Sequence, residues 1–324
     1  MIDETVFRGT RLCIVGNICR DSKTAPISPD VRLFQDGETP TESIVETIGG
    51  GGANSALFAT GLGAETRFAG KVGTDWQGKM LEHTMRSRGV ESFICRDPEV
   101  QTGNSLVINY TNGCRHFISH QPNNYNLNFS DIDLELFAKG GHFLRADVWF
   151  SEQMLAGGNA QLLKAAHNRG LATSLDLNWD PYWGFAPETR IKARKEAVRQ
   201  ILPLVDMLHG NVRELNCFTD STDLTTTFQR LEAWGAETVV VHMGAQGAGY
   251  YCRGDFIVEP SVSVRKHVNT TGSGDLLSVC LMLLHDRKDI QYGEKLRLAN
   301  HIVADFIEGR RQFLPTLSMG PDYS

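Results

Sequence analysis

The chain has 324 residues, a formal net charge of −6 and 41% hydrophobic residues. A chain of this length can bury a substantial core, and it suits one large α/β domain with an elaboration better than two equal domains. The mild charge indicates no nucleic-acid or membrane partner, and no apolar run reaches the length of a membrane span. The one basic cluster, at residues 190–199, alternates with apolar residues and predicts the solvated face of an amphipathic helix.

The N-terminal segment and the cysteines bear on the cellular compartment. The first residues, MIDETVF, are acidic where a secretory signal would be basic, and no adequate apolar region precedes the first predicted strand. The seven cysteines are an odd number without close pairs, which is typical of neither a disulfide framework nor a zinc site. We therefore expect a cytoplasmic protein with reduced cysteines.

Short β-branched or aromatic runs alternate with helical patterns through most of the chain, as in a parallel sheet with crossover helices. The predicted strands are residues 11–16, 66–72, 147–151, 172–177, 206–209 and 238–243. The predicted helices are residues 53–62, 76–88, 160–169, 191–202, 224–234, 274–285 and 292–308. Residues 28–48 and 101–120 break the alternation and have strand-like character, with a hairpin turn at Gly113. We expect these two stretches to form a small sheet that projects from the main domain.

Four consecutive glycines, residues 49–52, precede the first predicted helix. Such a run costs much conformational entropy unless something must approach the backbone, and a small polyol would be a suitable ligand. Asn17 and Asp21 after the first strand, and Asn54 in the helix, would offer acceptors and donors for its hydroxyl groups. The alternative is a tight strand-to-helix turn with Asp21 as a solvated loop residue.

Polar pairs and a glycine turn follow three later predicted strands, where open α/β sheets bind their ligands. Asp176 and Asn178 end one strand, and Asn211 and Glu214 follow the next. A single carboxylate there could hold Mg²⁺ through its waters, although the same Asn-x-x-Glu spacing is common in helix caps. The turn around residues 244–247, with Gly244 and Gly247, suits either a nucleotide or a tight hairpin.

The run Gly272-Ser273-Gly274-Asp275 stands at the start of an apolar, buried helix. Backbone N–H groups at a helix N-terminus have no intrahelical partner, and together with the helix dipole they favour a phosphate or a developing anion. Asp275 follows directly, so it could act as a general base toward an attacking hydroxyl while the turn stabilises the transferred phosphoryl group. The alternative is an aspartate that only favours the first turn of a helix.

In this order, these motifs resemble the ribokinase-like (PfkB) family of carbohydrate and nucleoside kinases over nearly the whole chain. The N-terminal signature of the family is similar to residues 49–54 and 70–78, its lid segment to residues 102–105 with the following hairpin, and its C-terminal signature to residues 269–275. The Asp-x-Asn strand end, the Asn-x-x-Glu pair and the late glycine turn of the family are matched at residues 176–178, 211–214 and 244–247.

The resemblance implies a single α/β domain over residues 1–324, in which a central, mostly parallel sheet is flanked by helices. A β-sheet lid would be formed by about residues 22–48 and 100–122. The ligands would be ATP, Mg²⁺ and a sugar or polyol, and lids that pair between subunits would make a homodimer.

The resemblance also assigns roles to residues. The catalytic group would comprise Asp275 as base and Gly272, Ser273 and Gly274 as anion hole. The acceptor would contact Asn17, Asp21, Gly50, Gly51 and Asn54. The nucleotide would lie near Asn178, Asn211, Gly244, Gly247 and Asn300, with Glu214 at the metal through water.

Three departures from the family pattern are visible. Asn269 replaces an aspartate that helps to bind a monovalent cation, and residues 309–313 add bulk and positive charge there. Both changes argue against potassium activation, and one possibility is that Arg310 or Arg311 takes the place of the cation. Asp180 stands where several relatives have a basic residue, so phosphorylated or acidic acceptors are disfavoured. The bulky residues 276–280 could narrow the nucleotide pocket.

The leading hypothesis is an ATP- and Mg²⁺-dependent kinase of a neutral sugar or polyol. A nucleoside kinase of the same family is the first alternative, and it would be favoured if Phe34, Tyr110 or Phe117 stacked on a base from the lid. A non-catalytic sugar or nucleotide sensor is the second alternative. The intact Gly-Ser-Gly turn followed by Asp275 argues against a sensor, because binding alone needs no base.

Overall fold

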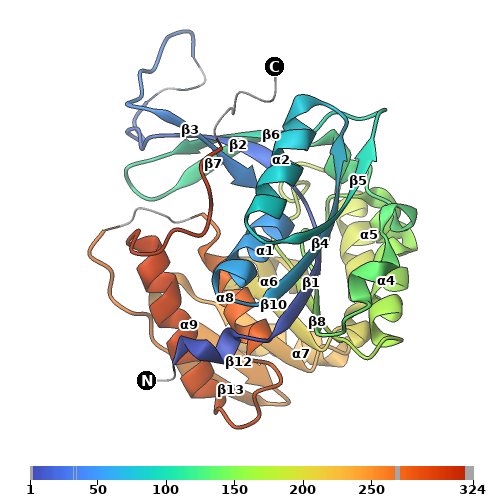
Figure 1. The fold of residues 1–324 in the computed structure, drawn as a ribbon. Coiled ribbons are helices and arrows are strands. Elements are labelled where there is room, and N and C mark those ends of the chain that lie inside the picture. The colour runs from blue at the N-terminus through green and yellow to red at the C-terminus, as the bar shows by residue number, and fades with distance from the viewer. Residues whose placement is uncertain (1–2, 32, 34, 267–270, 318–324) are drawn as a thin grey trace.

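A nine-stranded sheet forms the middle layer of the molecule (Figure 1). The structure is a computed structural model that describes residues 3–31, 33, 35–266 and 271–317. Neighbouring strands of the large sheet are parallel, except that β12 is antiparallel to both β11 and β13. In spatial order the strands are β13 (Asp255–Glu259), β12 (Ala248–Cys252), β11 (Thr238–His242), β10 (Met207–Asn211), β9 (Ala172–Asp176), β8 (His142–Arg145), β1 (Arg11–Val15), β4 (Glu65–Gly73) and β5 (Glu91–Asp97).

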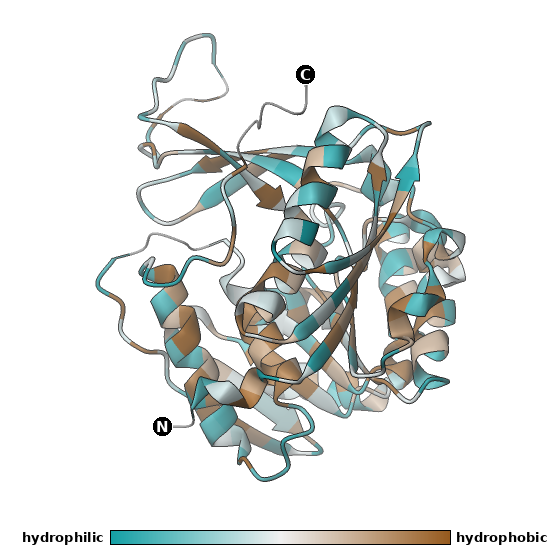
Figure 2. Ribbon diagram, viewed as in Figure 1, coloured by the Kyte–Doolittle hydropathy of each residue, from teal (hydrophilic) through white to brown (hydrophobic). Residues whose placement is uncertain are grey.

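Helices cover both faces of this sheet, and each face has its own apolar cluster. One face carries α1 (Gly51–Gly61), α2 (Trp76–Ser87), α8 (Ser273–Leu283) and α9 (Tyr292–Ile307). The other face carries α4 (Asn159–His167), α5 (Glu188–Arg199), α6 (Val212–Thr219) and α7 (Leu224–Ala233), and the short α3 (Pro122–Tyr125) follows the hairpin of the small sheet. Figure 2 shows hydrophobic residues gathered in the large sheet and where helices meet it. The predicted α/β fold is confirmed.

Two of these helices are buried along most of their length. All residues from Leu276 to Leu283 in α8 are buried, as are all residues from Gly52 to Ala59 in α1. A helix that is apolar all round belongs inside a protein, and here α8 packs between α1 and α9 on the sheet. The N-termini of α1 and α8 therefore have fixed positions relative to the strand ends.

A separate four-stranded sheet projects beside the α1 and α2 side of the body (Figure 1). The strand order of this small sheet is β3 (Ile44–Gly49), β2 (Cys19–Thr24), β6 (Asn104–Asn109) and β7 (Arg115–His120). The turn at Gly113 joins β6 to β7, as predicted. The segment after α9 reaches this sheet, where Thr316 forms a bridge with Thr47.

Two expectations about strands are wrong. Residues 147–151 form a turn, and the strand is β8, which begins five residues earlier and ends at Arg145. The sequence His-Phe-Leu-Arg does not indicate a buried strand, because its first and last residues are polar. Both are nevertheless buried. In residues 28–48, the strand is limited to β3, and β2 begins at Cys19, before the stretch that we expected to pair.

Some of the predicted features lie outside the described residues. These are Phe34, Asn269 and Thr270. No helix in the described part of the chain is both long and apolar enough to span a bilayer.

Candidate active site

The predicted site residues gather where the parallel strands of the large sheet end. Asn17 follows β1, Asn178 follows β9, Asn211 ends β10 and Gly244 follows β11. The carboxyl ends of parallel strands lie at one edge of a sheet, and the N-termini of α1 and α8 pack against the same sheet. The sequence motifs are therefore brought to one region, although they span more than 250 residues of the chain.

Asp147, which the sequence analysis did not select, joins three of these segments. Its carboxylate accepts hydrogen bonds from the backbone N–H groups of Asn17 and Gly52, both at 2.9 Å, and of Gly51 at 3.3 Å. Its own N–H donates to Oδ1 of Asn178 at 3.0 Å. The residue has a left-handed φ of 56° and is buried. It fixes the first turn of α1 between the ends of β1 and β9.

The glycine run is explained by close contacts around this turn. Gly50 has a φ of 95°, and a Cβ there would lie 2.4 Å from the carbonyl oxygen of Asn17. At Gly49, a Cβ would lie 2.0 Å from Oδ1 of Asp21, and at Gly51 one would lie 2.8 Å from Oδ1 of Asp147. The tight turn is thus real, and buried Asp21 is not a solvated loop residue.

Asp275 lies in the first turn of α8, three residues after the N-cap Gly272, which has a left-handed φ of 86°. Burial raises the pKa of Asp275 to about 7, and the negative charges of Asp147 and Glu214 act in the same direction. The side chain of Asn54 forms a hydrogen bond with Asp275 that lowers the pKa. Asn54 is buried and its Oδ1 has no partner among the described residues, so an acceptor stays available beside the carboxyl group.

A positive charge reaches this carboxyl cluster from the small sheet. Arg115, the first residue of β7, lowers the pKa of Asp275 by its charge. Desolvation lowers the pKa of Arg115 itself, and the charges of Asp275 and Glu214 partly oppose that shift. The register of the small sheet places Arg115 on the same face as Phe117 and Asp21. Sequence reasoning missed Arg115 because nothing in the hairpin sequence indicates which face turns toward the large sheet.

The proposed nucleotide and metal residues have local structural contacts. Asn211 and Glu214 form a capping box, in which Oε2 of Glu214 accepts from the N–H of Asn211 at 2.8 Å. Burial raises the pKa of Glu214. Among the described residues, no three acidic, histidine or cysteine side chains converge to hold a metal ion. A Mg²⁺ ion at Glu214 would therefore need ligands from outside the protein, as phosphates and water provide.

The remaining predicted nucleotide residues lie around β11, β13 and α9. Gly247, with a φ of 103°, closes the turn after β11, and a Cβ there would lie 2.1 Å from the carbonyl oxygen of Glu259. Gly244, with a φ of 58°, has open space around its Cβ position. Asn300 donates hydrogen bonds to the carbonyl oxygens of Glu259 and Pro260 at 3.1 and 3.0 Å, so its amide nitrogen holds the end of β13.

Asp180 does not face a ligand, contrary to the premise of the sequence argument. It is fully buried and forms an ion pair with Arg194, in which Nε lies 2.8 Å from Oδ2. The repulsion that we expected toward an acidic acceptor is therefore absent. Arg194 is buried too, so the basic cluster in α5 is not a fully solvated face.

The structure also shows the contacts of the other two departures from the family pattern, Arg310 with Arg311 and residues 276–280. Arg310 pairs with Asp305 and Glu308, and Arg311 pairs with Glu4 and Asp305, so both guanidinium groups are neutralised by carboxylates. Nothing in these contacts supports a replacement of a monovalent cation. The bulky residues 276–280 are buried in the apolar cluster around α8.

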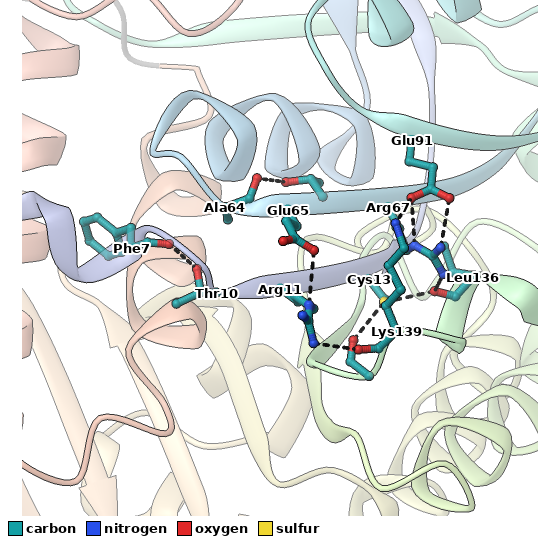
Figure 3. A network of polar contacts seen from close by, with 12 residues as sticks. Phe7, Thr10, Arg11, Cys13, Ala64, Glu65, Arg67, Glu91, Leu136 and Lys139 are labelled. Atoms are coloured by element: carbon teal, nitrogen blue, oxygen red, sulfur yellow. Dashed lines mark hydrogen bonds and ion pairs between the residues drawn. The ribbon is translucent and has the colours of Figure 1, made fainter.

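A separate polar cavity of about 180 Å³ lies at the opposite, amino end of the sheet (Figure 3). Its cations are paired: Arg11 with Glu65, and both Arg67 and Lys139 with Glu91. Burial raises the pKa of Cys13 at its base to about 11, so this thiol is not a nucleophile at neutral pH. None of the predicted site residues lines this cavity.

The fold and the motifs at the strand ends define a ribokinase-like kinase, and comparison with known proteins identifies the family. The model of the pfkB family of carbohydrate kinases matches residues 10–283, and the chain belongs to this family. Fructokinase of Vibrio alginolyticus is 26% identical over 249 residues, which are 76% of this chain and 78% of that protein. The protein is accordingly a carbohydrate kinase, a phosphotransferase.

Solved structures share the same fold. A putative ribokinase II of E. coli in complex with ATP and Mg²⁺ has a TM-score of 0.76 and 20% identity, over 95% of this chain and 96% of that one. Ribokinase of Arabidopsis thaliana, complexed with ribose and ATP, has a TM-score of 0.73 and 22% identity, over 94% and 95% of the two chains.

Proposed function

We propose that this protein transfers the terminal phosphoryl group of ATP to a hydroxyl group of a small neutral sugar or polyol. Asp275 acts as the general base, and the N–H groups of Gly272, Ser273 and Gly274 form the anion hole. The observation that carries the proposal is a carboxyl group with a pKa of about 7 in the first turn of a buried helix. Such a group can take a proton at neutral pH and release it again.

The acceptor would lie between the small sheet and the N-terminus of α1. Asp21, Asn17 and Asn54, with the backbone at Gly50 and Gly51, would surround the acceptor and offer both donors and acceptors, and the three side chains are buried. Oδ1 of Asn54 has no partner in the described part of the chain, and a sugar hydroxyl would supply one. The names of the relatives, fructokinase and ribokinase, support a neutral sugar. Asp180, paired with Arg194, carries no part of this argument.

ATP and Mg²⁺ are the proposed cofactors. The nucleotide would extend from the α8 turn past Gly244 and Gly247 toward Asn300, and Asn178 and Asn211 border it at the strand ends. The negative charges of Asp147 and Glu214 raise the pKa of Asp275, so a divalent cation that arrives with the phosphates would relieve their repulsion. Glu214 would hold Mg²⁺ through water, and Mg²⁺ supplies charge stabilisation on the phosphates.

The test is phosphoryl transfer to a panel of sugars that includes fructose and ribose. We expect turnover by the native protein, and Asp275→Asn should lower kcat by about a hundredfold to ten-thousandfold while MgATP still binds. Asp255→Asn, an exposed carboxyl group at the start of β13, is the matched control and should keep full activity. The proposal is lost if no acceptor is phosphorylated, or if Asp275→Asn turns over like the native protein.

A nucleoside acceptor is the second candidate, because one aromatic side chain of the small sheet is placed for it. Phe117 is 43% exposed and shares the face of Arg115, whose Cζ lies 5.9 Å from the ring centroid. An exposed ring on this face could stack on a base. Thermal-shift measurements with sugars and nucleosides distinguish the two candidates, since the acceptor that binds the folded state raises Tm.

A further inference from the structure

Asp21 and Lys23 form a largely buried ion pair on one face of the small sheet. Both belong to β2 and are two residues apart, so their side chains share that face. Nζ of Lys23 lies 3.7 Å from Oδ2 of Asp21, and the two side chains are 16% and 6% exposed. A Cβ on Gly49, the last residue of β3, would lie 2.0 Å from Oδ1 of Asp21. The pair therefore stands beside the turn that leads into α1.

Neither charge of this pair has the hydrogen bonds that a buried ion needs. An ammonium group has three donors, but Nζ of Lys23 is too far from Asp21 for a hydrogen bond and donates to no other atom of the described residues. Within the same residues, the carboxylate of Asp21 accepts only from the thiol of Cys19, a weak donor, at 3.5 Å. A buried ion pair is favourable only when further hydrogen bonds satisfy its remaining donors and acceptors. The pair therefore has room for partners that are not part of the chain.

Two further polar atoms near the pair are buried without a partner. Thr47 of β3 is directly opposite Asp21 in the sheet, so its side chain lies on the same face. Its Oγ1 has no hydrogen-bond partner in the described part of the chain, and the same is true of Oδ1 of Asn54 in α1, which packs against β3. Buried polar atoms are rarely unpaired in native proteins, and a ligand is one explanation.

The chemistry of these groups fits a ligand that is rich in hydroxyl groups. A hydroxyl group both accepts and donates, so one hydroxyl can accept from Nζ of Lys23 and donate to Oδ2 of Asp21. Its oxygen can be at hydrogen-bond distance from both atoms, because the gap between them is 3.7 Å. An acidic group would be repelled by Asp21, and an apolar group would leave both charges unpaired.

We propose that Lys23 is a further acceptor-binding residue of this kinase, which holds one hydroxyl group of the sugar or polyol together with Asp21. This hydroxyl is not the one that receives the phosphoryl group, because the reacting hydroxyl faces Asp275. The inference rests on the proposed function, since it takes the space beside α1 as the acceptor site. It makes Lys23 a specificity-determining residue, because an acceptor without this hydroxyl leaves two buried charges unpaired.

Steady-state kinetics with the best acceptor test the contact. Lys23→Met keeps a long side chain without a donor, and we expect KM for the acceptor to rise about tenfold to a hundredfold, with kcat and KM for ATP nearly unchanged. Lys23→Gln keeps a neutral donor and should lose less. Lys79→Met, the same substitution at an exposed lysine of α2, is the matched control and should keep native kinetics. A native KM for the acceptor in Lys23→Met would overturn the inference.

Deoxy analogues of the acceptor distinguish a direct contact from a structural role. Calorimetry should show that one monodeoxy analogue binds the native protein about tenfold or more weakly than its parent, and that this difference shrinks in Lys23→Met. Equal weakening of the parent and of every analogue in Lys23→Met would show a structural role only, and would contradict the inference.

Two results with the native protein alone would also contradict it. One is full affinity for every monodeoxy analogue, since no second hydroxyl would then be held. The other is a preference for an aldonic acid over its parent sugar, since Lys23 would then hold a carboxylate. Loss of the proposed function itself would instead appear as a native protein that phosphorylates no acceptor.

Discussion

Asp275 is a carboxyl group whose neighbours are mostly other carboxyl groups. Asp147 and Glu214 raise its pKa in addition to burial, and Arg115 and the Asn54 hydrogen bond oppose them. This balance leaves the group close to half ionised at neutral pH, which suits a base that must both take and release a proton.

The raised pKa gives a direct prediction for pH dependence. A carboxyl group acts as base only when ionised, and the ionised fraction of Asp275 increases as pH rises through about 7. We expect kcat/KM for the acceptor to rise about tenfold per pH unit below pH 7 and to level off above it. Steady-state kinetics from pH 5 to 9 measure this, and a flat profile down to pH 5 would exclude Asp275 as the titrating base.

Arg115 offers a second prediction at the same scale. Removing its charge in Arg115→Met should raise the pKa of Asp275, so the midpoint of the kcat/KM profile should move to higher pH. Arg115→Lys keeps a positive charge and should leave the midpoint closer to the native one. A midpoint that is unchanged in Arg115→Met would show that the small sheet does not influence the base.

At the scale of elements, the N-terminus of α1 is built around glycines that no other residue can replace. Gly50 combines a φ of 95° with the carbonyl oxygen of Asn17 2.4 Å from its Cβ position. The hairpin glycine Gly113 has a similar φ of 82° but open space around it. A side chain at Gly113 would therefore meet backbone strain alone, and one at Gly50 would meet both strain and steric overlap.

Substitution by alanine at these two positions should therefore have different costs. Gly113→Ala should cost about 1 kcal/mol of unfolding free energy through strain alone. Gly50→Ala adds overlap with backbone that cannot move aside, so we expect a loss of about 3 kcal/mol or more, together with weaker acceptor binding. Urea denaturation of both variants provides the measurement. Equal losses would show that the contact with Asn17 is relieved at little cost.

Sequence reasoning could predict these elements where local signals agree. Glycines before an apolar helix located α1 and α8, and the turn at Gly113 located the β6–β7 hairpin. β8 was missed because His142 and Arg145 are buried polar residues whose partners, Ser174 and Asn159, come from distant segments. The same error hid Asp147, which follows that strand.

The site was predictable to the same extent. Residues carried by a strand end or a helix start could be grouped from the sequence, since parallel strands share an edge. Arg115 and the ion pair between Asp180 and Arg194 could not, because they depend on which face of a strand or helix meets another element. Asp180 shows the consequence: we expected its charge to act on a ligand, whereas it pairs with Arg194 of α5.

At the scale of the whole molecule, the outer face of the small sheet exposes three large apolar side chains. Ile44, Leu106 and Ile118 lie on one face by register, and they are 58%, 38% and 53% exposed. The opposite face carries Asp21 and Arg115. We propose that two copies pair through this outer face, as the resemblance of the lid implies, because exposed apolar patches commonly mark interfaces.

Sedimentation of the native protein should then show a dimer, and Ile118→Glu should shift it toward monomer by placing a charge within the apolar face. Phe185→Ser is the control, since Phe185 is 73% exposed and lies after β9, outside the small sheet. A native monomer at micromolar concentration, or a dimer that Ile118→Glu leaves intact, would contradict the pairing.

The position of Arg115 links proton binding to shape. α8 packs against α1, α9 and the large sheet, whereas the positive charge of Arg115, which opposes Asp275, stands on the separate small sheet. A displacement of β7 toward α8 brings Arg115 closer and favours the ionised form of Asp275. A displacement away favours the protonated form. By thermodynamic reciprocity, ionisation of Asp275 must pull the two sheets together with the same free energy. A rise in pH and a bound sugar would thus both favour the approach of the small sheet to α8, and each would strengthen the effect of the other.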